Sequence, residues 1–444
     1  MTFNKTYFMI GIGGIGMSAI ALHLVENGAS VWGYDKVESP ITRMLSDVGV
    51  HIMYEPTIEA MPEEVKHKNV EVIYTAAILK RNPLWQFFDL QGNRMYKRAA
   101  FLGKICSDKK TFAIAGTHGK TTTASILTHL FATDNRAFTA FVGGIVKKYN
   151  SNYISTGIDF YVVEADEYDR SFLQLFPTHA VITTMDADHM EIYDSLEGIE
   201  QGFTAFAKQV KNTLLVSYGL PLSNLTYGFE ANASYSIPSF KPHNEGYLFD
   251  VVTPEGEEKA LYFNQIGKHN LVNALCAISL AHLEGVSFES IRKGLASFPG
   301  IERRMNQYHL DDLLLIDDYA HHPVELKAVL KTIKSTYPKR KNGIVFQPHL
   351  FSRTRDFMCD FASVLSEFDE VILLDIYPAR ELPIEGVTSD NLLNLITNPN
   401  KKKVQKVDLL SAIEESKADL LVMAGAGDIG LEVQKILMQL NPTT

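Results

Sequence analysis

The sequence is poor in cysteine and tryptophan, since its 444 residues include three cysteines and two tryptophans. Cys106, Cys276 and Cys359 lie far apart and form no CxxC pair, which argues against a cysteine-based zinc site or a disulfide framework. This cysteine usage is typical of a protein in a reducing compartment. We expect all three thiols to be buried and inert.

Long apolar runs are also missing. No segment approaches the roughly 20 consecutive apolar residues that a membrane span requires. The apolar stretch at residues 7–24 is interrupted by glycines and lacks the basic start and cleavage site of a signal peptide. We therefore expect a cytoplasmic protein with no membrane insertion.

Positive charge is scarce as well, because 52 acidic residues outnumber 42 lysines and arginines and give a net charge of −10. Nucleic-acid binding depends on clustered cations, so we expect no nucleic-acid partner. A few local donors in an acidic protein still suffice to bind a nucleotide. The apolar share of 46% fits a globular protein, and the length predicts roughly three domains.

Strands and helices alternate along the chain, which is typical of parallel sheets with crossover helices. Helices are predicted to end near Asn27, to follow the glycine loop at residue 119, to cover residues 270–282, and to begin near Val324. Short β-like pieces at residues 227–263 predict an antiparallel addition. The predicted strands are residues 7–10, 30–33, 70–75, 111–115, 160–163, 180–183, 313–316, 343–346, 371–374 and 420–423.

The fold class that follows is α/β with three domains. We place the boundaries near residues 105 and 301, which gives domains at 1–105, 106–301 and 302–444.

A glycine-rich loop between a predicted strand and a predicted helix carries the strongest signal for function. Glycines let backbone N–H groups curl around phosphates, and a helix N-terminus adds positive potential. The match to the general phosphate-loop pattern is incomplete, because Ile114 stands at its first glycine position. A capped turn is the alternative, but Gly-Lys-Thr in this context favours phosphate binding. The residues are Gly116, Thr117, His118, Gly119, Lys120, Thr121 and Thr122.

Carboxylates follow the next predicted strand, in the sequence EADE at residues 164–167. A carboxylate at a strand's carboxyl end beside a phosphate loop suits a Mg²⁺ ion, which prefers oxygen ligands. Glu164 and the Thr121 hydroxyl are therefore the expected ligands. His189, in DADH after the following strand, is a weaker candidate for a further metal contact.

The motif GIGGIG follows the first strand and fits the GxGxxG pattern, with Asp35 about twenty residues further on. This pattern alone is weak, since GAGDIG at residues 425–430 fits it too. We expect the second copy to serve strand–helix packing or to lie at the edge of a nucleotide site. The first copy is a candidate diphosphate site, formed by Gly11, Gly13, Gly14, Ile15, Gly16 and Asp35.

Smaller clusters are dense in catalytic-type groups, although each also has a bland interpretation as helix caps or solvated charge. Asn270 and Asn273 lie three apart on one predicted helical face. The others are ERRM at residues 302–305, DDYAHHP at 317–323 and QPH at 347–349, which is followed by Arg353 and Arg355.

In this order, the motifs GIGGIGMS, GTHGKTTT, EADE, DADHM, GKHN, ERRM, DDYAHHP and FQPH with SRTRD resemble the Mur ligases. The resemblance extends from about Phe8 to Gly430 and therefore covers all three predicted domains. It implies a Rossmann-like N-terminal domain for a UDP-sugar, a central P-loop ATPase-type domain, and a Rossmann-like C-terminal domain that closes over ATP. The expected cofactors are ATP and Mg²⁺.

The resemblance also implies substrates and roles. The expected substrates are UDP-N-acetylmuramate and L-alanine, joined through an acyl phosphate by a monomer or weak homodimer. Glycines 11–16 would hold the UDP diphosphate, and Thr121, Glu164 and His189 would bind Mg²⁺. Asn270, Asn273, Arg304 and Asp318 would contact the nucleotide. The residues expected to take part in catalysis are Lys120, His189, Arg304, His321 and Arg353.

Two positions depart from the pattern of the alanine-adding branch. Tyr168 follows EADE where serine is more usual, and Leu350 stands where several relatives carry arginine. The sequence EADEYD also resembles the branch that attaches a murein tripeptide, so this activity is the alternative. A nicotinamide oxidoreductase would explain GxGxxG with Asp35 but leaves the phosphate loop and EADE unexplained. A non-catalytic nucleotide switch is a further alternative.

Overall fold

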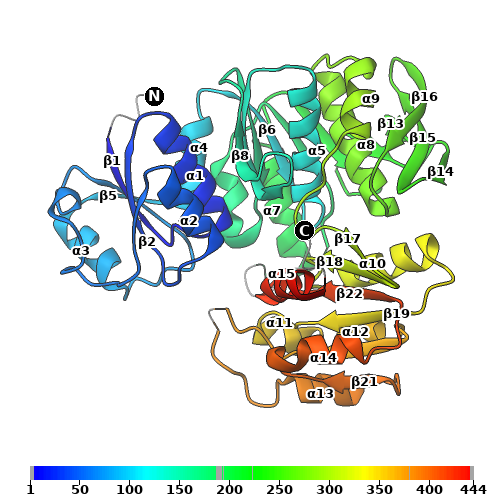
Figure 1. The fold of residues 1–444 in the computed structure, drawn as a ribbon. Helices are drawn as coiled ribbons and strands as arrows, with labels where there is room; N and C mark the ends of the chain where they lie inside the picture. Colours follow the sequence, from blue (N-terminus) through cyan, green and yellow to red (C-terminus); the bar gives the residue numbers. More distant parts are fainter. Residues whose placement is uncertain (1–4, 187–192, 194, 223, 380, 441–444) are drawn as a thin grey trace. The chain divides into compact units, whose positions relative to one another are not determined.

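The computed structural model describes residues 5–186, 193, 195–222, 224–379 and 381–440. In this part of the chain the strands form three sheets (Figure 1). Residues 1–265 and 270–299 make up one compact unit, and residues 266–269 and 300–444 make up a second. Each unit is described by itself.

The first sheet has five parallel strands in the order β3-β2-β1-β4-β5. Side chains alternate along its central strand. Tyr7 and Met9 pack in the cluster that holds the buried residues of α1 and α4, whereas Phe8 and Ile10 pack with Phe88 of α3. Its elements are β1 Thr6–Ile10, α1 Ile15–Glu26, β2 Ser30–Tyr34, α2 Pro40–Asp47, β3 His51–Met53, β4 Glu71–Tyr74, α3 Pro83–Gln91, β5 Arg94–Lys97 and α4 Arg98–Cys106.

The second sheet belongs to the same unit and has eleven strands. Strand β6 lies between β10 and β9, and all three are parallel, so their carboxyl ends meet at one edge. The first elements are β6 Lys110–Ala115, α5 Lys120–Thr133, β7 Phe138–Val146, β8 Ser151–Ser155, β9 Phe160–Ala165, the 3-10 helix η2 Tyr168–Gln174, β10 His179–Ile182, α7 Leu196–Ala207 and β11 Thr213–Ser217.

The expected antiparallel addition is present, but it is smaller than predicted. Strands β14, β15 and β16 pair antiparallel, and β13 also pairs antiparallel with β15. Strands β12 and β13, however, pair in parallel and extend the main sheet. The remaining elements of this unit are β12 Leu225–Gly228, β13 Tyr235–Ser236, β14 Phe240–His243, β15 Gly246–Thr253, β16 Gly256–Phe263, α8 Lys268–Leu283 and α9 Phe288–Ala296.

The second unit contains a six-stranded sheet in the order β17-β18-β22-β19-β20-β21, in which the pairs other than β17–β18 are parallel. Leu314 and Ile316 pack in the cluster of α10 and α12, and Leu315 packs with α14 and α15. The elements are β17 Asn306–Leu310, β18 Leu313–Asp318, α10 Pro323–Thr336, β19 Asn342–Phe346, α11 Phe351–Asp356, α12 Met358–Leu365, β20 Glu370–Leu373, α13 Ser389–Leu395, β21 Lys401–Lys403, α14 Leu409–Glu414, β22 Leu420–Ala424 and α15 Ile429–Leu440.

The prediction of three buried cysteines is wrong for Cys359. Cys106 and Cys276 are buried, but Cys359 is exposed. Helix α12 buries Phe361, Ala362 and Leu365, and Cys359 lies on its outward side. None of the helices among the described residues is long and apolar enough to cross a bilayer.

Candidate nucleotide and substrate site

The glycine-rich loop joins β6 to α5, as predicted, and its conformation requires glycine at two positions. Gly116 and Gly119 have φ angles of +129° and +81°. A Cβ atom on Gly116 would lie 2.0 Å from Thr183 Oγ1. The loop is also held near the end of β10, since the Thr184 hydroxyl accepts a hydrogen bond from the His118 backbone N–H at 2.9 Å. Among the described residues no side chain caps α5, so its first N–H groups can receive an anion.

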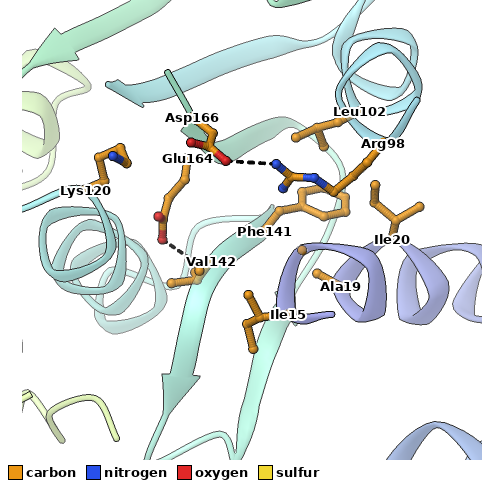
Figure 2. A pocket seen from close by; sticks show the side chains of 12 residues that line it. Ile15, Ala19, Ile20, Arg98, Leu102, Lys120, Phe141, Val142, Glu164 and Asp166 are labelled. Atoms are coloured by element: carbon orange, nitrogen blue, oxygen red, sulfur yellow. Dashed lines mark hydrogen bonds and ion pairs between the residues drawn. The ribbon is translucent and has the colours of Figure 1, made fainter. Parts of the chain in front are cut away.

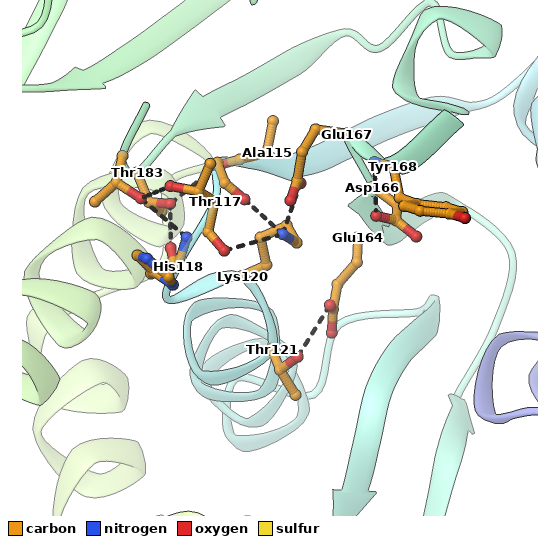
Figure 3. Close-up of polar contacts among 12 residues, drawn as sticks. Ala115, Thr117, His118, Lys120, Thr121, Glu164, Asp166, Glu167, Tyr168 and Thr183 are labelled. Carbon is orange, nitrogen blue, oxygen red and sulfur yellow. Dashed lines mark hydrogen bonds and ion pairs between the residues drawn. The ribbon is translucent and has the colours of Figure 1, made fainter. Parts of the chain in front are cut away.

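Lys120 is the first residue of α5, and its ammonium group lies across the loop (Figure 3). It donates to the Gly116 carbonyl at 2.6 Å and forms an ion pair with Glu167 at 2.7 Å. Burial acts to lower the pKa of Lys120, but Glu167, Asp166 and Glu164 outweigh it and the pKa is raised. The lysine is therefore held as a cation beside the phosphate loop.

Thr121 and Glu164 lie together, as the metal prediction requires. The Thr121 hydroxyl donates to Glu164 Oε2 at 3.0 Å (Figure 3). The other carboxylate oxygen of Glu164 accepts from the Gly143 N–H. Mg²⁺ usually binds one or two protein oxygens and completes its shell with waters and phosphate oxygens. This pair fits that donor set. His189 lies outside the described residues.

Helix α8 brings one of its two amides, that of Asn273, to the same loop. Asn270 and Asn273 are both buried. A Cβ atom on Gly119 would lie 2.5 Å from Asn273 Oδ1, so this side chain is pressed against the start of α5. Both residues belong to one helix, α8, as predicted, and their contact with a nucleotide stays a prediction.

The first glycine motif forms the turn between β1 and α1. Gly11 has a φ of +84°, and Gly14 precedes α1, which no side chain caps among the described residues. Asp35, at the end of β2, accepts from the Gly13 N–H at 2.7 Å and from the Lys36 N–H at 2.8 Å. Both carboxylate oxygens thus bind the protein backbone. A dinucleotide site would instead use such an acid for a ribose hydroxyl.

One cavity of about 200 Å³ is lined by both loops (Figure 2). Ile15 and Gly16 begin α1 directly after the first loop, Lys120 begins α5 directly after the second, and Glu164 belongs to β9. The cavity also contains Arg98, which the motif analysis missed. Arg98 pairs with Asp166 at 3.0 Å. No local pattern marks this arginine, because its partner Asp166 lies 68 residues further along the chain.

The remaining predicted residues belong to the second unit. Asp318 is buried at the end of β18 and accepts from the Met305 and Ala320 N–H groups, both at 2.8 Å. Burial raises its pKa, although Arg304 acts in the opposite direction. The Arg304 guanidinium lies 5.4 Å from the centre of the Tyr319 ring.

His321 and Arg353 follow β18 and β19 respectively. The His321 Nδ1 atom lies 2.9 Å from the Tyr319 carbonyl oxygen and 3.4 Å from the Glu325 carboxylate. Arg353, in α11, is 8% exposed. Leu350 caps α11 with a φ of +72°.

Two glycines of the second motif lie directly against neighbouring side chains. A Cβ atom on Gly427 would lie 2.5 Å from Gln347 Oε1, and one on Gly430 would lie 2.6 Å from Arg303 Nε. Arg303 also donates to the carbonyls of Gly425 and Gly427. The glycines leave room for these side chains.

Fold and site together are those of an α/β nucleotide-binding enzyme in which two glycine-rich loops lie beside one cavity. Family descriptions cover most of the chain. "Mur ligase family, catalytic domain" matches residues 6–110, "Mur ligase middle domain" matches 114–281, and "Mur ligase, glutamate ligase domain" matches 303–431.

Individual relatives agree with these matches. The UDP-N-acetylmuramate–L-alanine ligase of Flavobacterium johnsoniae is 48% identical over 98% of each chain, and that of Porphyromonas gingivalis is 40% identical over 96% of each. The structure of the UDP-N-acetylmuramate–alanine ligase from Thermotoga maritima has a TM-score of 0.84 at 26% identity and covers 99% of this chain and 100% of its own. A murein peptide ligase from Psychrobacter arcticus shares the fold, with a TM-score of 0.74 at 20% identity over 99% of both chains. The chain belongs to the Mur ligase family.

Proposed function

We propose that this protein is an ATP-dependent ligase that joins L-alanine to the carboxylate of UDP-N-acetylmuramate, a step in peptidoglycan precursor synthesis. One observation carries the proposal: Gly16, Lys120 and Glu164 line the same cavity. A loop suited to the diphosphate of a UDP-sugar therefore faces a loop suited to the triphosphate of ATP. The relatives named for this activity, at 40–48% identity over nearly the full chain, support the choice of substrates.

The chemistry follows from the weakness of a carboxylate as an electrophile. A carboxylate oxygen of the muramoyl group attacks the γ-phosphorus of ATP, ADP leaves, and an acyl phosphate forms. The amine of L-alanine then attacks the acyl carbon. The tetrahedral intermediate expels inorganic phosphate and loses a proton, which leaves an amide.

Positioning and electrostatics dominate phosphoryl transfer, so the loop residues have clear tasks. Lys120 neutralises charge that spreads over the transferring phosphoryl group, and the N–H groups at the start of α5 bind phosphate oxygens. Thr121 and Glu164 would hold Mg²⁺, which supplies further charge neutralisation when bound. Asn270 and Asn273 would orient the nucleotide.

The second unit would supply the remaining groups. We assign Arg304 and Asp318 to the nucleotide, and His321 and Arg353 to the incoming amino acid. A cationic guanidinium suits the α-carboxylate of L-alanine, since charge-assisted hydrogen bonds to carboxylates are among the strongest in proteins. Leu350 does not offer such a contact.

The experiment compares two amine substrates. Purified protein receives UDP-N-acetylmuramate, ATP and Mg²⁺ with either L-alanine or the murein tripeptide, and the ligated product is identified by mass. We expect the L-alanine product. A tripeptide product alone would assign the protein to the tripeptide branch, and turnover with NAD in place of ATP would overturn the proposal.

A further inference from the structure

The cavity between the two loops contains a guanidinium group to which the proposed function gives no task. Arg98 is the first residue of α4 and lines the cavity (Figure 2). Its side chain lies against Gly16, the last residue of the first glycine motif. A Cβ atom on Gly16 would lie 2.3 Å from Arg98 Nη1. The guanidinium therefore lies directly against the glycine backbone, in space that only glycine leaves open.

The Arg98 guanidinium uses only part of its hydrogen-bonding capacity within the described residues. Its Nη2 atom donates to Asp166 at 3.0 Å, and within the described residues this is the only protein hydrogen bond of the guanidinium. An arginine has five N–H donors in a planar fork that matches a carboxylate. Several donors thus remain for a ligand in the cavity.

Apolar side chains line part of the cavity beside this cation, whose own side chain is 28% exposed. Ile20, Leu102 and Phe141 line the cavity beside it and are 1%, 8% and 5% exposed (Figure 2). Walls of this kind limit the access of water, and they strengthen a charge-assisted hydrogen bond that forms next to them.

We propose that Arg98 binds the carboxylate of the sugar-nucleotide substrate and fixes it between the first glycine loop and Lys120. The inference rests on the proposed function and names the residue that recognises the acid. In the proposed function, the first glycine loop binds the diphosphate and Lys120 contacts the transferred phosphoryl group, and both line this cavity. Arg98 lines the cavity between them and supplies the cation that the acid itself requires.

The rival explanation is that the Arg98–Asp166 ion pair only stabilises the packing of α4 against the segment after β9. A neighbouring ion pair provides the control. Lys97 pairs with Asp169 at 2.7 Å, one residue before Arg98, and its side chain is 52% exposed. Lys97 does not line the cavity. A purely structural role predicts similar losses of substrate affinity when either cation is replaced, whereas substrate binding predicts such a loss only when Arg98 is replaced.

The test measures binding to the full-length protein by calorimetry in the absence of ATP. The probes are UDP-N-acetylmuramate and UDP-N-acetylglucosamine, which lacks the lactyl carboxylate. We expect Arg98→Ala to weaken UDP-N-acetylmuramate binding on the order of 10- to 100-fold, since a hydrogen bond to a charged group contributes affinity of this size. Its affinity for UDP-N-acetylglucosamine should stay within about twofold of wild type, because the lost contact is absent there.

Two further variants complete the comparison. Lys97→Ala and Asp166→Asn should each weaken UDP-N-acetylmuramate by less than about threefold, as expected for partly exposed pairs. Arg98→Gln, which keeps the side chain's length, should reproduce the selective loss if Arg98→Ala folds poorly. Equal losses of both sugar nucleotides in the Arg98 variants, or an equal loss in Lys97→Ala, would overturn the inference and leave the proposed function intact. A wild-type protein that binds neither compound would overturn both.

Discussion

Substitution of Gly119 by alanine tests the geometry of the phosphate loop. Gly119 has a φ of +81°, which costs a residue with a Cβ atom about 1–2 kcal/mol relative to glycine. The new Cβ atom would also lie 2.5 Å from Asn273 Oδ1, and overpacking of this kind costs about 1–3 kcal/mol. We expect the free energy of unfolding to fall by about 2–5 kcal/mol from these two causes.

Gly285→Ala is the matched control. Gly285 has a similar φ of +77°, but nothing lies within 4 Å of its added Cβ atom. This variant should lose only the backbone contribution of about 1–2 kcal/mol and should bind nucleotide normally.

The assay pairs urea unfolding with calorimetric titration of a non-hydrolysable ATP analogue. For Gly119→Ala we expect affinity to fall at least tenfold, because Asn273 or the loop must move and the N–H groups of α5 move with it. If Gly119→Ala lost no more stability than Gly285→Ala and bound the analogue like wild type, the tight contact between the loop and α8 would be refuted.

Three further predictions concern the other parts of the site. Lys120→Ala should reduce phosphate release by at least about 10²- to 10³-fold, since one preorganised charge contact is lost, while calorimetry detects UDP-sugar binding close to wild type. An equal loss of UDP-sugar binding would contradict the division of tasks between the loops. Asp35→Ala removes the acceptor of the Gly13 N–H and should weaken UDP-sugar binding about 5- to 30-fold, with ATP-analogue affinity unchanged in the same titration. His23 and His129 are buried, and burial lowers the pKa of each to about 4. The unfolded chain then binds more protons between pH 6.5 and 4, so the free energy of unfolding should fall by about 2 kcal/mol per histidine on acidification to pH 5. A His23→Phe variant with an unchanged pH dependence in urea titrations would argue against this cause.

The fold was predictable at several strands that are buried on both faces, although the interior strands β7 and β11 were not predicted. Such strands are continuous apolar runs, and β1, β6, β9, β18 and β22 were all located from the sequence within one or two residues. Edge strands were missed for the same physical reason. Strand β21 is Lys401–Lys403 and β5 is Arg94–Lys97, and neither has an apolar pattern. Lysine on an edge strand discourages pairing with another sheet, but it also hides the strand from pattern analysis.

The site divides in a similar way. Residues next to a strand end or inside a glycine loop, such as Lys120 and Glu164, were found because the local pattern carries their chemistry. Arg98 and the ion pair between Lys120 and Glu167 were not, because they depend on contacts between segments far apart in sequence. Asp35 was selected as a ligand-binding acid from its spacing after the GxGxxG motif. In the structure its carboxylate instead accepts a hydrogen bond from the Gly13 N–H of the loop.

The most direct test of the central claim follows an oxygen atom. UDP-N-acetylmuramate labelled with ¹⁸O in its carboxylate is converted with ATP, Mg²⁺ and L-alanine, and the released phosphate is analysed by mass. An acyl phosphate requires that the attacking carboxylate oxygen leave with the phosphoryl group, so each phosphate should carry one labelled oxygen. Phosphate that carries no label, released either together with the amide product or without any product, would contradict phosphoryl transfer from ATP to the acid.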